Sequence, residues 1–325
     1  LPESGARVVP VAGDASARRY FRLSHGASTW MLADSPPASQ KNAEFLAIRE
    51  VLAKSGIRVP NMLAADLERG YLLLEDLGDA LLLAGLNEDS ADQAYAPAFH
   101  ILERLAAIPV VGLELPAYDT ALLSEELARF GEWFVEALLE YKLSDGEREI
   151  ISRLERVLIS SALEQPRVLV HRDFHSRNLM CLPDGELGVI DFQDAVVGPI
   201  TYDPVSLLKD CYIRWPRERV ETWALAHRAR LVEAGLLSAV DEPVFLRWFD
   251  WMGLQRHIKV LGTFARLYLR DGKPGYLADL PLVAAYVEET LALYAGSGPE
   301  LAAFADWFAG ELRPEIAAQS WSKPA

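Results

Sequence analysis

The segment from residue 168 to residue 194, VLVHRDFHSRNLMCLPDGELGVIDFQD, constrains the fold more than any other part of the sequence. An apolar run leads into a polar loop that holds Asp173 and Asn178, and a second apolar run ends at the Pro-Asp-Gly turn signal of residues 183–185. The chain then runs back as a strand to Asp191. If it reverses at this turn, Asn178 and Asp191 lie nearly opposite each other, about one strand spacing (~5 Å) apart.

Two carboxylates and an amide that converge in this way suit metal-assisted phosphoryl transfer. Mg²⁺ binds one or two protein oxygens and keeps its other positions for water and phosphate, which Asp191 and Asn178 would supply. A carboxylate that does not bind the metal, here Asp173, can orient an acceptor hydroxyl and accept its proton. The spacing matches the kinase pattern H-R-D-x-x-x-x-N followed by Asp-Phe. The alternative interpretation is an acidic surface loop beside a buried hairpin.

Length and charge narrow the class of protein. The chain has 325 residues, 51% of them hydrophobic and 24% charged, so it can build a large core in two lobes or domains. Its net charge of −15 makes a nucleic-acid backbone an unsuitable partner. The two cysteines, Cys181 and Cys211, make no disulfide framework and favour a reducing compartment. The sequence shows neither an apolar run of membrane-spanning length nor a signal-peptide pattern, so we expect a cytoplasmic protein.

Residues 6–76 predict a small lobe with the order strand, strand, strand, helix, strand, strand, which is that of a kinase N-terminal lobe. The expected strands cover residues 7–12, 17–23, 28–33, 62–66 and 71–74. The helix is expected over residues 40–54, where Phe45, Ile48 and Leu52 recur at helical spacing ahead of Gly56.

Two short segments of this lobe are candidates for nucleotide contacts. Asp14, Ala15 and Ser16 lie between the first two strands, where a kinase covers the nucleotide phosphates with backbone N–H groups and a hydroxyl. An ordinary hairpin turn is the alternative there. Glu75 and Leu77 follow the fifth strand, where the backbone would pair with an adenine edge.

The rest of the chain predicts mostly helices. They are expected over residues 92–108, 124–143, 144–164, 204–213, 216–234, 243–270, 281–295 and 300–312, ahead of a frayed tail from 319. The third of these begins with the capping box Ser144-Asp145-Gly146-Glu147.

Several stretches together support a family resemblance. They are GDASARRYFR (13–22), ADSPP (33–37), LLLEDLGD (72–79), HRDFHSRNLM (171–180), DFQDAVVGPITYDPVSLLKD (191–210) and GLQRHIKVLGTFARL with RDGK (253–273). With them the chain resembles the aminoglycoside phosphotransferase and choline kinase superfamily, and within it the anomeric kinases of N-acetylmuramate and N-acetylglucosamine. The resemblance implies an α+β, two-lobed protein-kinase-like fold. Residues 1–78 would form the nucleotide-binding lobe, with an antiparallel sheet and a helix, and residues 79–325 a mostly helical catalytic and acceptor-binding lobe.

The resemblance also implies roles for single residues. Asp173 would be the catalytic base, His175 would lie near the transferred phosphoryl group, and Asn178 and Asp191 would hold Mg²⁺. Asp203 would brace the catalytic loop, or would cap the helix that follows it.

Two departures from the wider kinase pattern matter. The third strand carries no Lys to bind the phosphates, so Arg18, Arg19 or Arg22 must supply the charge unless the metal alone does, and we include Arg19 among the nucleotide contacts. Asp203 follows Asp191 by only twelve positions, which leaves no activation segment to hold a peptide and indicates a small-molecule acceptor.

The acceptor is expected against the helix that contains residues 248–259. An aromatic face and planar hydrogen-bonding groups suit a sugar, and an arginine suits a lactyl carboxylate. The predicted substrate-binding residues are Arg177, Trp251, Gln255, Arg256 and His257. The alternative is a core helix with aromatic packing and a solvated basic edge.

The sequence and this resemblance together lead us to expect a monomeric, cytoplasmic kinase that uses ATP and Mg²⁺, with neither nucleic acid nor membrane as partner. The resemblance implies that it phosphorylates the anomeric hydroxyl of N-acetylmuramate and N-acetylglucosamine in cell-wall recycling. Another small-molecule kinase, acting on an aminoglycoside, choline or an amino alcohol, is one alternative. A nucleotide-binding pseudokinase is the other, although the complete set of Asp173, Asn178 and Asp191 argues against it.

Overall fold

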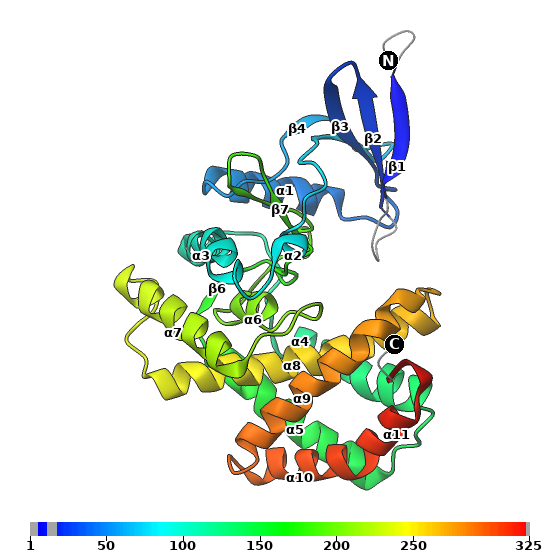
Figure 1. Cartoon of the computed structure of the whole chain (residues 1–325), viewed down its shortest axis with the longest axis vertical. Helices are drawn as coiled ribbons and strands as arrows, with labels where there is room; N and C mark the ends of the chain where they lie inside the picture. The colour runs from blue at the N-terminus through cyan, green and yellow to red at the C-terminus, as the bar shows by residue number, and fades with distance from the viewer. Residues whose placement is uncertain (1–5, 12–17, 323–325) are drawn as a thin grey trace. The chain divides into compact units, whose positions relative to one another are not determined.

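The computed structural model describes residues 6–11 and 18–322, and its chain forms two compact units (Figure 1). Unit 1 comprises Leu1–Ile108 and His171–Ala195, and unit 2 comprises Pro109–Val170 and Val196–Ala325. Residues 171–195 thus pack with the N-terminal part of the chain. The functional division expected at residue 78 is a different one and stays a prediction.

Unit 1 contains an antiparallel five-stranded sheet with the strand order β1-β2-β3-β5-β4 (Figure 1). The strands are β1 (Arg7–Val11), β2 (Arg19–His25), β3 (Ser28–Asp34), β4 (Met62–Asp66) and β5 (Tyr71–Glu75). All five strands were expected from the alternating apolar pattern. The register pairs Arg19 with Asp34 and Trp30 with Glu75, so the middle strand β3 is bonded on both sides.

Helix α1 (Asn42–Lys54) follows β3 and buries Phe45, Ile48 and Leu52, as its spacing predicted. The turn between β4 and β5 holds the connection from β3 to α1 in place. Gly70 in that turn has φ +77°, and a Cβ there would lie 2.2 Å from the main-chain oxygen of Ser35. Only glycine allows this approach, in which the Ser35 N–H donates to Gly70 O at 2.8 Å.

The remainder of unit 1 contains α2 (Leu82–Gly85), α3 (Ala91–Ala107) and the hairpin of β7 (Leu179–Cys181) and β8 (Leu187–Val189). The hairpin is bonded to earlier parts of the chain on both strands. Cys181 N donates to Ala80 O and Val189 N donates to Arg58 O, each at 2.7 Å. These bonds explain why residues 171–195 belong to this unit.

Unit 2 is helical apart from β6 (Arg167–Val170) and β9 (Val196–Pro199), which pair antiparallel. Its helices are α4 (Thr120–Arg129), α5 (Asp145–Leu163), α6 (Tyr202–Leu208), α7 (Arg217–Glu233), α8 (Glu242–Leu269), α9 (Leu280–Tyr294), α10 (Pro299–Trp307) and α11 (Arg313–Ala318), with π-helices at Phe130–Leu138 and Phe308–Leu312 and 3-10 turns at Pro274–Asp279 and Ser320–Ser322. The predicted capping box is confirmed, since Ser144 N donates to Glu147 Oε2 at 2.7 Å.

Several predicted boundaries in unit 2 are wrong. The helix expected over residues 124–143 becomes a π-helix and ends at Leu138, because Glu140 adopts φ +56°, which no helix contains. The helix expected to reach residue 213 ends at Leu208. In the tail expected to fray from residue 319, Ser320–Ser322 forms a 3-10 turn, and residues 323–325 lie outside the described part of the chain. The β9 strand has no counterpart among the sequence expectations.

Helix α8 is the central helix of unit 2 and packs against α4, α5, α6, α7 and α9 (Figure 1). Gly262 allows its closest approach, because a Cβ there would lie 2.3 Å from the carbonyl carbon of Arg129. Gly253 has ordinary room, with Lys209 Cδ as its nearest neighbour at 3.4 Å. Close packing therefore explains the glycine at position 262 but not the one at position 253.

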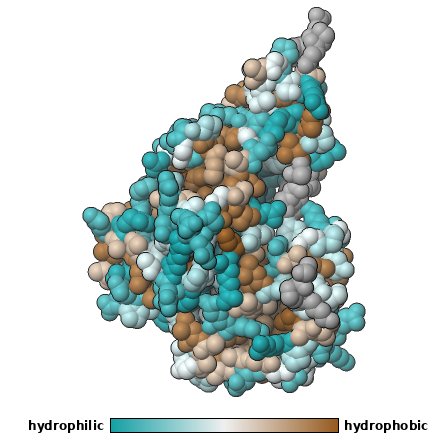
Figure 2. Space-filling model, viewed as in Figure 1, coloured by the Kyte–Doolittle hydropathy of each residue, from teal (hydrophilic) through white to brown (hydrophobic). Residues whose placement is uncertain are grey.

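Hydrophilic and hydrophobic residues are interspersed over the face shown in Figure 2. The large apolar side chains that are most exposed lie on separate elements, such as Val8 (56%), Leu63 (51%) and Val111 (94%). Among the helices of the described residues, none is long and apolar enough to cross a membrane.

Candidate active site

The loop from His171 to Asn178 is closed by main-chain hydrogen bonds around Asp173. His175 N donates to Asp173 O at 3.0 Å, and Asn178 N donates to His175 O at 2.9 Å. The Asn178 amide adds a third bond, from Nδ2 to Asp173 O at 2.9 Å. Asp173 and Asn178, two of the residues that the spacing singled out, are therefore held by one short network with His175, and Asp173 itself is only partly buried.

His171 anchors this loop to the hairpin. Its Nδ1 accepts the N–H of Asp173 at 3.2 Å, so the ring proton lies on Nε2, which donates to Ile190 O at 3.0 Å. Burial lowers the pKa of His171 to about 4, so the ring is neutral at pH 7. The imidazole is 1% exposed, which fits a structural role rather than a chemical one.

The hairpin brings Asp191 to the same end as Asn178. The pairing is shifted by one residue from the expected one, in which Asn178 lay nearly opposite Asp191. Leu179 pairs with Val189, so Asn178 faces Ile190, whose N–H donates to Asn178 O at 3.1 Å. Asp191 follows immediately and is exposed. Its carboxylate Oδ1 accepts a bond from Gln193 Nε2 at 2.7 Å.

Two residues of this region adopt the left-handed backbone conformation that non-glycine residues rarely use. Arg172 has φ +76° and Asp191 has φ +63°. Each such residue costs on the order of 1–3 kcal/mol, which the surrounding bonds must offset. One of those bonds runs from Arg172 Nη1 to Asp194 O at 3.2 Å. Strain on both sides of Asn178 is typical of a functional site.

The donor chemistry at this end of the hairpin suits Mg²⁺ better than a softer metal. Asn178 Nδ2 is committed to Asp173 O, which turns Oδ1 away from that carbonyl. One amide oxygen and one carboxylate leave most of a hard cation's positions to water and phosphate. Within residues 6–11 and 18–322, no group of three or more His, Cys, Asp and Glu side chains forms a metal-binding cluster.

The expected nucleotide contacts have different environments. Asp14, Ala15 and Ser16 lie outside the described residues. Glu75 forms an ion pair with Arg58, whose hydrogen bond is the main cause that lowers the pKa of the Glu75 carboxyl. The Glu75 N–H donates to Asn61 O at 2.9 Å, so this donor is not available to an adenine edge. The contacts of Glu75 and Leu77 with a nucleotide stay a prediction.

The third strand is as poor in cations as the sequence indicated, and the three arginines around β2 differ in environment. Arg19 is 70% exposed and forms an ion pair with Asp34, the residue opposite it in the sheet. Arg22 pairs with Asp76 at 2.7 Å and with Asp79 at 2.8 Å. Arg18 is 3% exposed, and the sequence alone could not single it out from its neighbours.

The structure places the predicted acceptor residues of α8 in the interior of unit 2. Gln255 Nε2 donates to the Tyr118 hydroxyl at 3.2 Å, and Arg256 Nη1 contacts Cys211 Sγ at 3.2 Å. His257 stacks on a tyrosine ring and bonds to a main-chain oxygen at 2.9 Å. These three side chains are at most 3% exposed, so their contact with an acceptor stays a prediction. Arg177 is partly buried within the catalytic loop.

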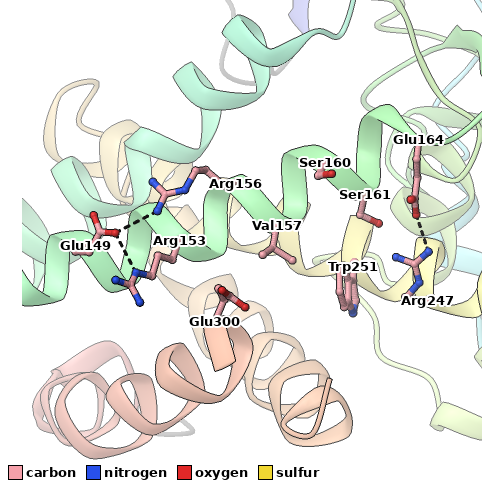
Figure 3. A pocket seen from close by; sticks show the side chains of 10 residues that line it. All are labelled: Glu149, Arg153, Arg156, Val157, Ser160, Ser161, Glu164, Arg247, Trp251 and Glu300. Atoms are coloured by element: carbon pink, nitrogen blue, oxygen red, sulfur yellow. Dashed lines mark hydrogen bonds and ion pairs between the residues drawn. The ribbon is translucent and has the colours of Figure 1, made fainter. Parts of the chain in front are cut away.

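Trp251 lines an open pocket of about 550 Å³, and Figure 3 shows the ten lining residues, all of which belong to unit 2. Much of the charge in this pocket is paired internally. Glu149 pairs with Arg153 at 2.9 Å, and Arg247 pairs with Glu164 at 2.6 Å (Figure 3). The pocket therefore places the Trp251 indole beside ion pairs whose charges neutralise each other.

Asp203 lies in the first turn of α6 and is 4% exposed. The helix begins at Tyr202 with Thr201 as its N-cap residue. The alternative in which Asp203 caps this helix is therefore wrong, and its bracing role stays a prediction.

Comparisons with known proteins agree with this site. A model of a phosphotransferase enzyme family matches residues 7–240. The N-acetylmuramate/N-acetylglucosamine kinase of Pseudomonas putida is 43% identical over 307 residues, which cover 94% of this chain and 87% of that protein. The kinase of the same name from Neisseria meningitidis serogroup B is 38% identical over 92% of this chain and 90% of that protein.

Among solved structures, the ethanolamine kinase of Plasmodium vivax is similar over 87% of this chain and 82% of that chain, with a TM-score of 0.64 and 13% identity. At this identity the likeness shows the fold alone, which confirms the predicted kinase-like architecture. Family match, relatives and fold all indicate a phosphotransferase. The chain therefore belongs to the phosphotransferase enzyme family and is a kinase of a small-molecule acceptor.

Proposed function

We propose that this chain transfers the γ-phosphoryl group of ATP to the anomeric hydroxyl of N-acetylmuramate and of N-acetylglucosamine. The observation that carries the substrate is the 43% identity, over 94% of the chain, to a kinase named for these two sugars. The chemistry is supported by the loop and hairpin that hold Asp173, Asn178 and Asp191 together in unit 1.

Asp173 is the proposed base. Its carboxylate accepts the proton of the anomeric hydroxyl as the sugar oxygen forms a bond to the γ-phosphorus and the bond to the β-phosphate oxygen breaks, which releases ADP. The bonds from the His175 main-chain N–H and the Asn178 side-chain amide to Asp173 O fix the backbone of this residue. Phosphoryl transfer needs little covalent participation by the protein. The rate therefore depends mainly on how the reacting groups are positioned and on how the developing charge is stabilised.

Asn178 Oδ1 and the Asp191 carboxylate are the proposed ligands of Mg²⁺, which when bound neutralises phosphate charge and aligns the transferred group. Gln193 orients the Asp191 carboxylate through its bond to Oδ1. His175, whose Nε2 lies 3.4 Å from Asn178 Nδ2, is the proposed donor to the transferred phosphoryl group.

For the acceptor side we propose the residues predicted from sequence, which are Arg177, Trp251, Gln255, Arg256 and His257. The chemistry behind this proposal is an indole for the sugar face and a guanidinium for the lactyl carboxylate that only N-acetylmuramate carries. A requirement for ATP and free amino sugars also leads us to propose a cytoplasmic, monomeric enzyme of cell-wall sugar recycling.

The test is incubation of the protein with ATP, Mg²⁺ and each sugar, followed by ³¹P NMR. A sugar 1-phosphate is the expected product with both acceptors. Product at C6, or none with either sugar, would reject the proposed substrate. Parallel incubations with an aminoglycoside, choline and ethanolamine would then identify another small-molecule acceptor, while failure to hydrolyse or transfer from ATP in any of them would favour a pseudokinase.

A further inference from the structure

Kinases bind the α- and β-phosphates of the nucleotide with a lysine on the third strand, which pairs with a glutamate of the following helix. In this chain β3 reads STWMLAD and contains no cation, so another residue must perform this task. Three arginines lie next to or within the neighbouring strand β2, namely Arg18, Arg19 and Arg22. Their environments in unit 1 distinguish them.

Arg19 and Arg22 are committed to carboxylates. Arg19 pairs across the sheet with Asp34 and is largely exposed. Arg22 forms bonds from both Nε and Nη2 to Asp76, and hydrogen bonds with Asp79 and Asp76 raise its pKa. An anionic ligand would have to displace these partners, which makes both arginines poor phosphate contacts.

Arg18 is buried and makes several contacts with neutral groups. Its Nε donates to the hydroxyl of Ser35 at 2.9 Å, and Nη2 contacts Asn42 Oδ1 at 3.4 Å. Its guanidinium carbon lies 4.7 Å from the centre of the Phe45 ring. These contacts fix the orientation of the guanidinium, and a buried charge of fixed orientation acts more strongly on a ligand than an exposed one.

The contacts of Arg18 come from the two elements that carry the phosphate-binding pair in other kinases. Ser35 directly follows β3, and Asn42 is the first residue of α1. The two are also bonded to each other, since Asn42 Nδ2 donates to Ser35 O at 2.8 Å. Arg18 therefore lies beside the end of β3 and the start of α1, although it reaches this place from the β2 side of the sheet.

A chain of bonds connects Arg18 to the proposed metal ligand. Arg18 Nη1 contacts Gln193 Oε1 at 3.4 Å, and Gln193 Nε2 donates to Asp191 Oδ1 at 2.7 Å. One amide thus separates the guanidinium from the carboxylate. Phe192, which lies between Asp191 and Gln193 in the sequence, stacks on Phe45 with ring centres 4.9 Å apart.

Tyr20 lies within the electrostatic influence of both charges. Burial raises the pKa of its phenol, the Arg18 guanidinium lowers it, and the Asp191 carboxylate raises it. Both charged groups therefore act on the same hydroxyl. A triphosphate whose terminal groups lie at a metal on Asp191 would place its inner phosphates next to Arg18.

We propose that Arg18 is the phosphate-binding cation of the donor site and takes the place of the missing third-strand lysine, with Gln193 coupling its position to Asp191. The inference rests on the proposed function in so far as the donor is a nucleotide, and it is independent of which sugar is the acceptor. Because it concerns contacts within unit 1 only, nucleotide binding without acceptor can test it.

The experiment measures Kd for ADP and for adenosine by calorimetry in the presence of Mg²⁺, without sugar. In Arg18→Gln we expect Kd for ADP to rise by about tenfold to a hundredfold, the usual effect of losing a charge-assisted hydrogen bond, while Kd for adenosine stays within about twofold. Arg49→Gln is the matched control. Arg49 is also a largely buried arginine of unit 1. It donates to Pro60 O at 2.8 Å and to Asn61 Oδ1 at 3.3 Å, and it pairs with the exposed Glu50 at 3.6 Å.

A second variant, Arg18→Lys, covers the case in which Arg18→Gln does not fold, because it keeps the buried charge and loses only the planar fork. It should retain part of the preference for ADP over adenosine, and circular dichroism would check folding. An unchanged Kd for ADP in a folded variant, or equal losses for ADP and adenosine, would overturn the proposal. A wild-type protein that binds ADP but phosphorylates neither sugar would reject the acceptor and keep the role of Arg18, whereas one that binds no ADP would reject both.

Discussion

Asn178 Nδ2 donates to the main-chain oxygen of Asp173 at 2.9 Å, so the residue proposed to bind the metal also fixes the backbone of the proposed base. The donor group of the amide serves the loop and leaves the oxygen for a cation. This double use explains why an amide, rather than a second carboxylate, suits this position. A carboxylate could accept a cation but could not donate to Asp173 O.

Asn178→Asp should therefore lower kcat although it adds a metal-binding oxygen. Loss of the donor leaves Asp173 O without this bond and places two acceptors against each other, for which we expect a loss of about tenfold to a thousandfold in kcat/KM. Kinetics across a Mg²⁺ series would measure it. Activity equal to wild type at saturating Mg²⁺ would show that the bond from Nδ2 is dispensable.

Asp173→Asn should abolish turnover and leave ADP binding within about twofold, because an amide keeps the shape but cannot accept the proton. We expect a fall in kcat on the order of 10² to 10⁴. Asp184→Asn is the control, since this exposed aspartate only accepts the N–H of Glu186 in the hairpin turn, which asparagine can also do. Near-normal turnover of Asp173→Asn would falsify the assignment of the base.

Acid should destabilise unit 1 through His171. Its pKa is about 4 in the folded chain because of burial, against about 6.5 when unfolded. The unfolded state thus binds the proton more readily, and the stabilisation is fully present above pH 6.5 and lost as the pH falls toward 4, by about 3 kcal/mol in total. Urea unfolding at pH 7 and pH 5 would measure the difference.

His171→Gln can keep a donor and an acceptor without titrating, so its stability should change less between these two pH values. His100→Gln is the control, because the His100 side chain is 69% exposed. If His171→Gln and wild type lost the same free energy of unfolding between pH 7 and pH 5, another group would be the source of the acid sensitivity.

Gly70→Ala should destabilise the fold by about 3 kcal/mol or more, because φ +77° strains an L-residue and its Cβ would overlap Ser35 O. Gly26→Ala has a similar backbone angle, φ +60°, but open space around its Cβ, so it should cost only about 1–2 kcal/mol. Thermal unfolding of both variants separates backbone strain from the collision. Because Ser35 also contacts Arg18, Gly70→Ala should weaken ADP binding as well.

Arg256→Lys tests the acceptor proposal. If the guanidinium binds the lactyl carboxylate as a bidentate pair, kcat/KM for N-acetylmuramate should fall about tenfold or more, while that for N-acetylglucosamine, which has no such group, should change little. Initial rates with both sugars give the ratio directly. Equal losses for the two sugars would assign Arg256, with its contact to Cys211, to the packing of unit 2.

Local sequence patterns determined much of this protein. Alternating apolar residues specified the five strands, helical spacing specified α1, and the Pro-Asp-Gly turn placed Asn178 and Asp191 at one end of a hairpin, because all of these depend on neighbours within a few residues. The tertiary structure decided what depends on distant partners. Arg18 and Gln193 are 175 residues apart, and no local spacing could show that Arg18 contacts a residue bonded to Asp191. The burial of Gln255, Arg256 and His257 was likewise decided by the helices that surround α8, since a helix periodicity defines faces but not what covers them.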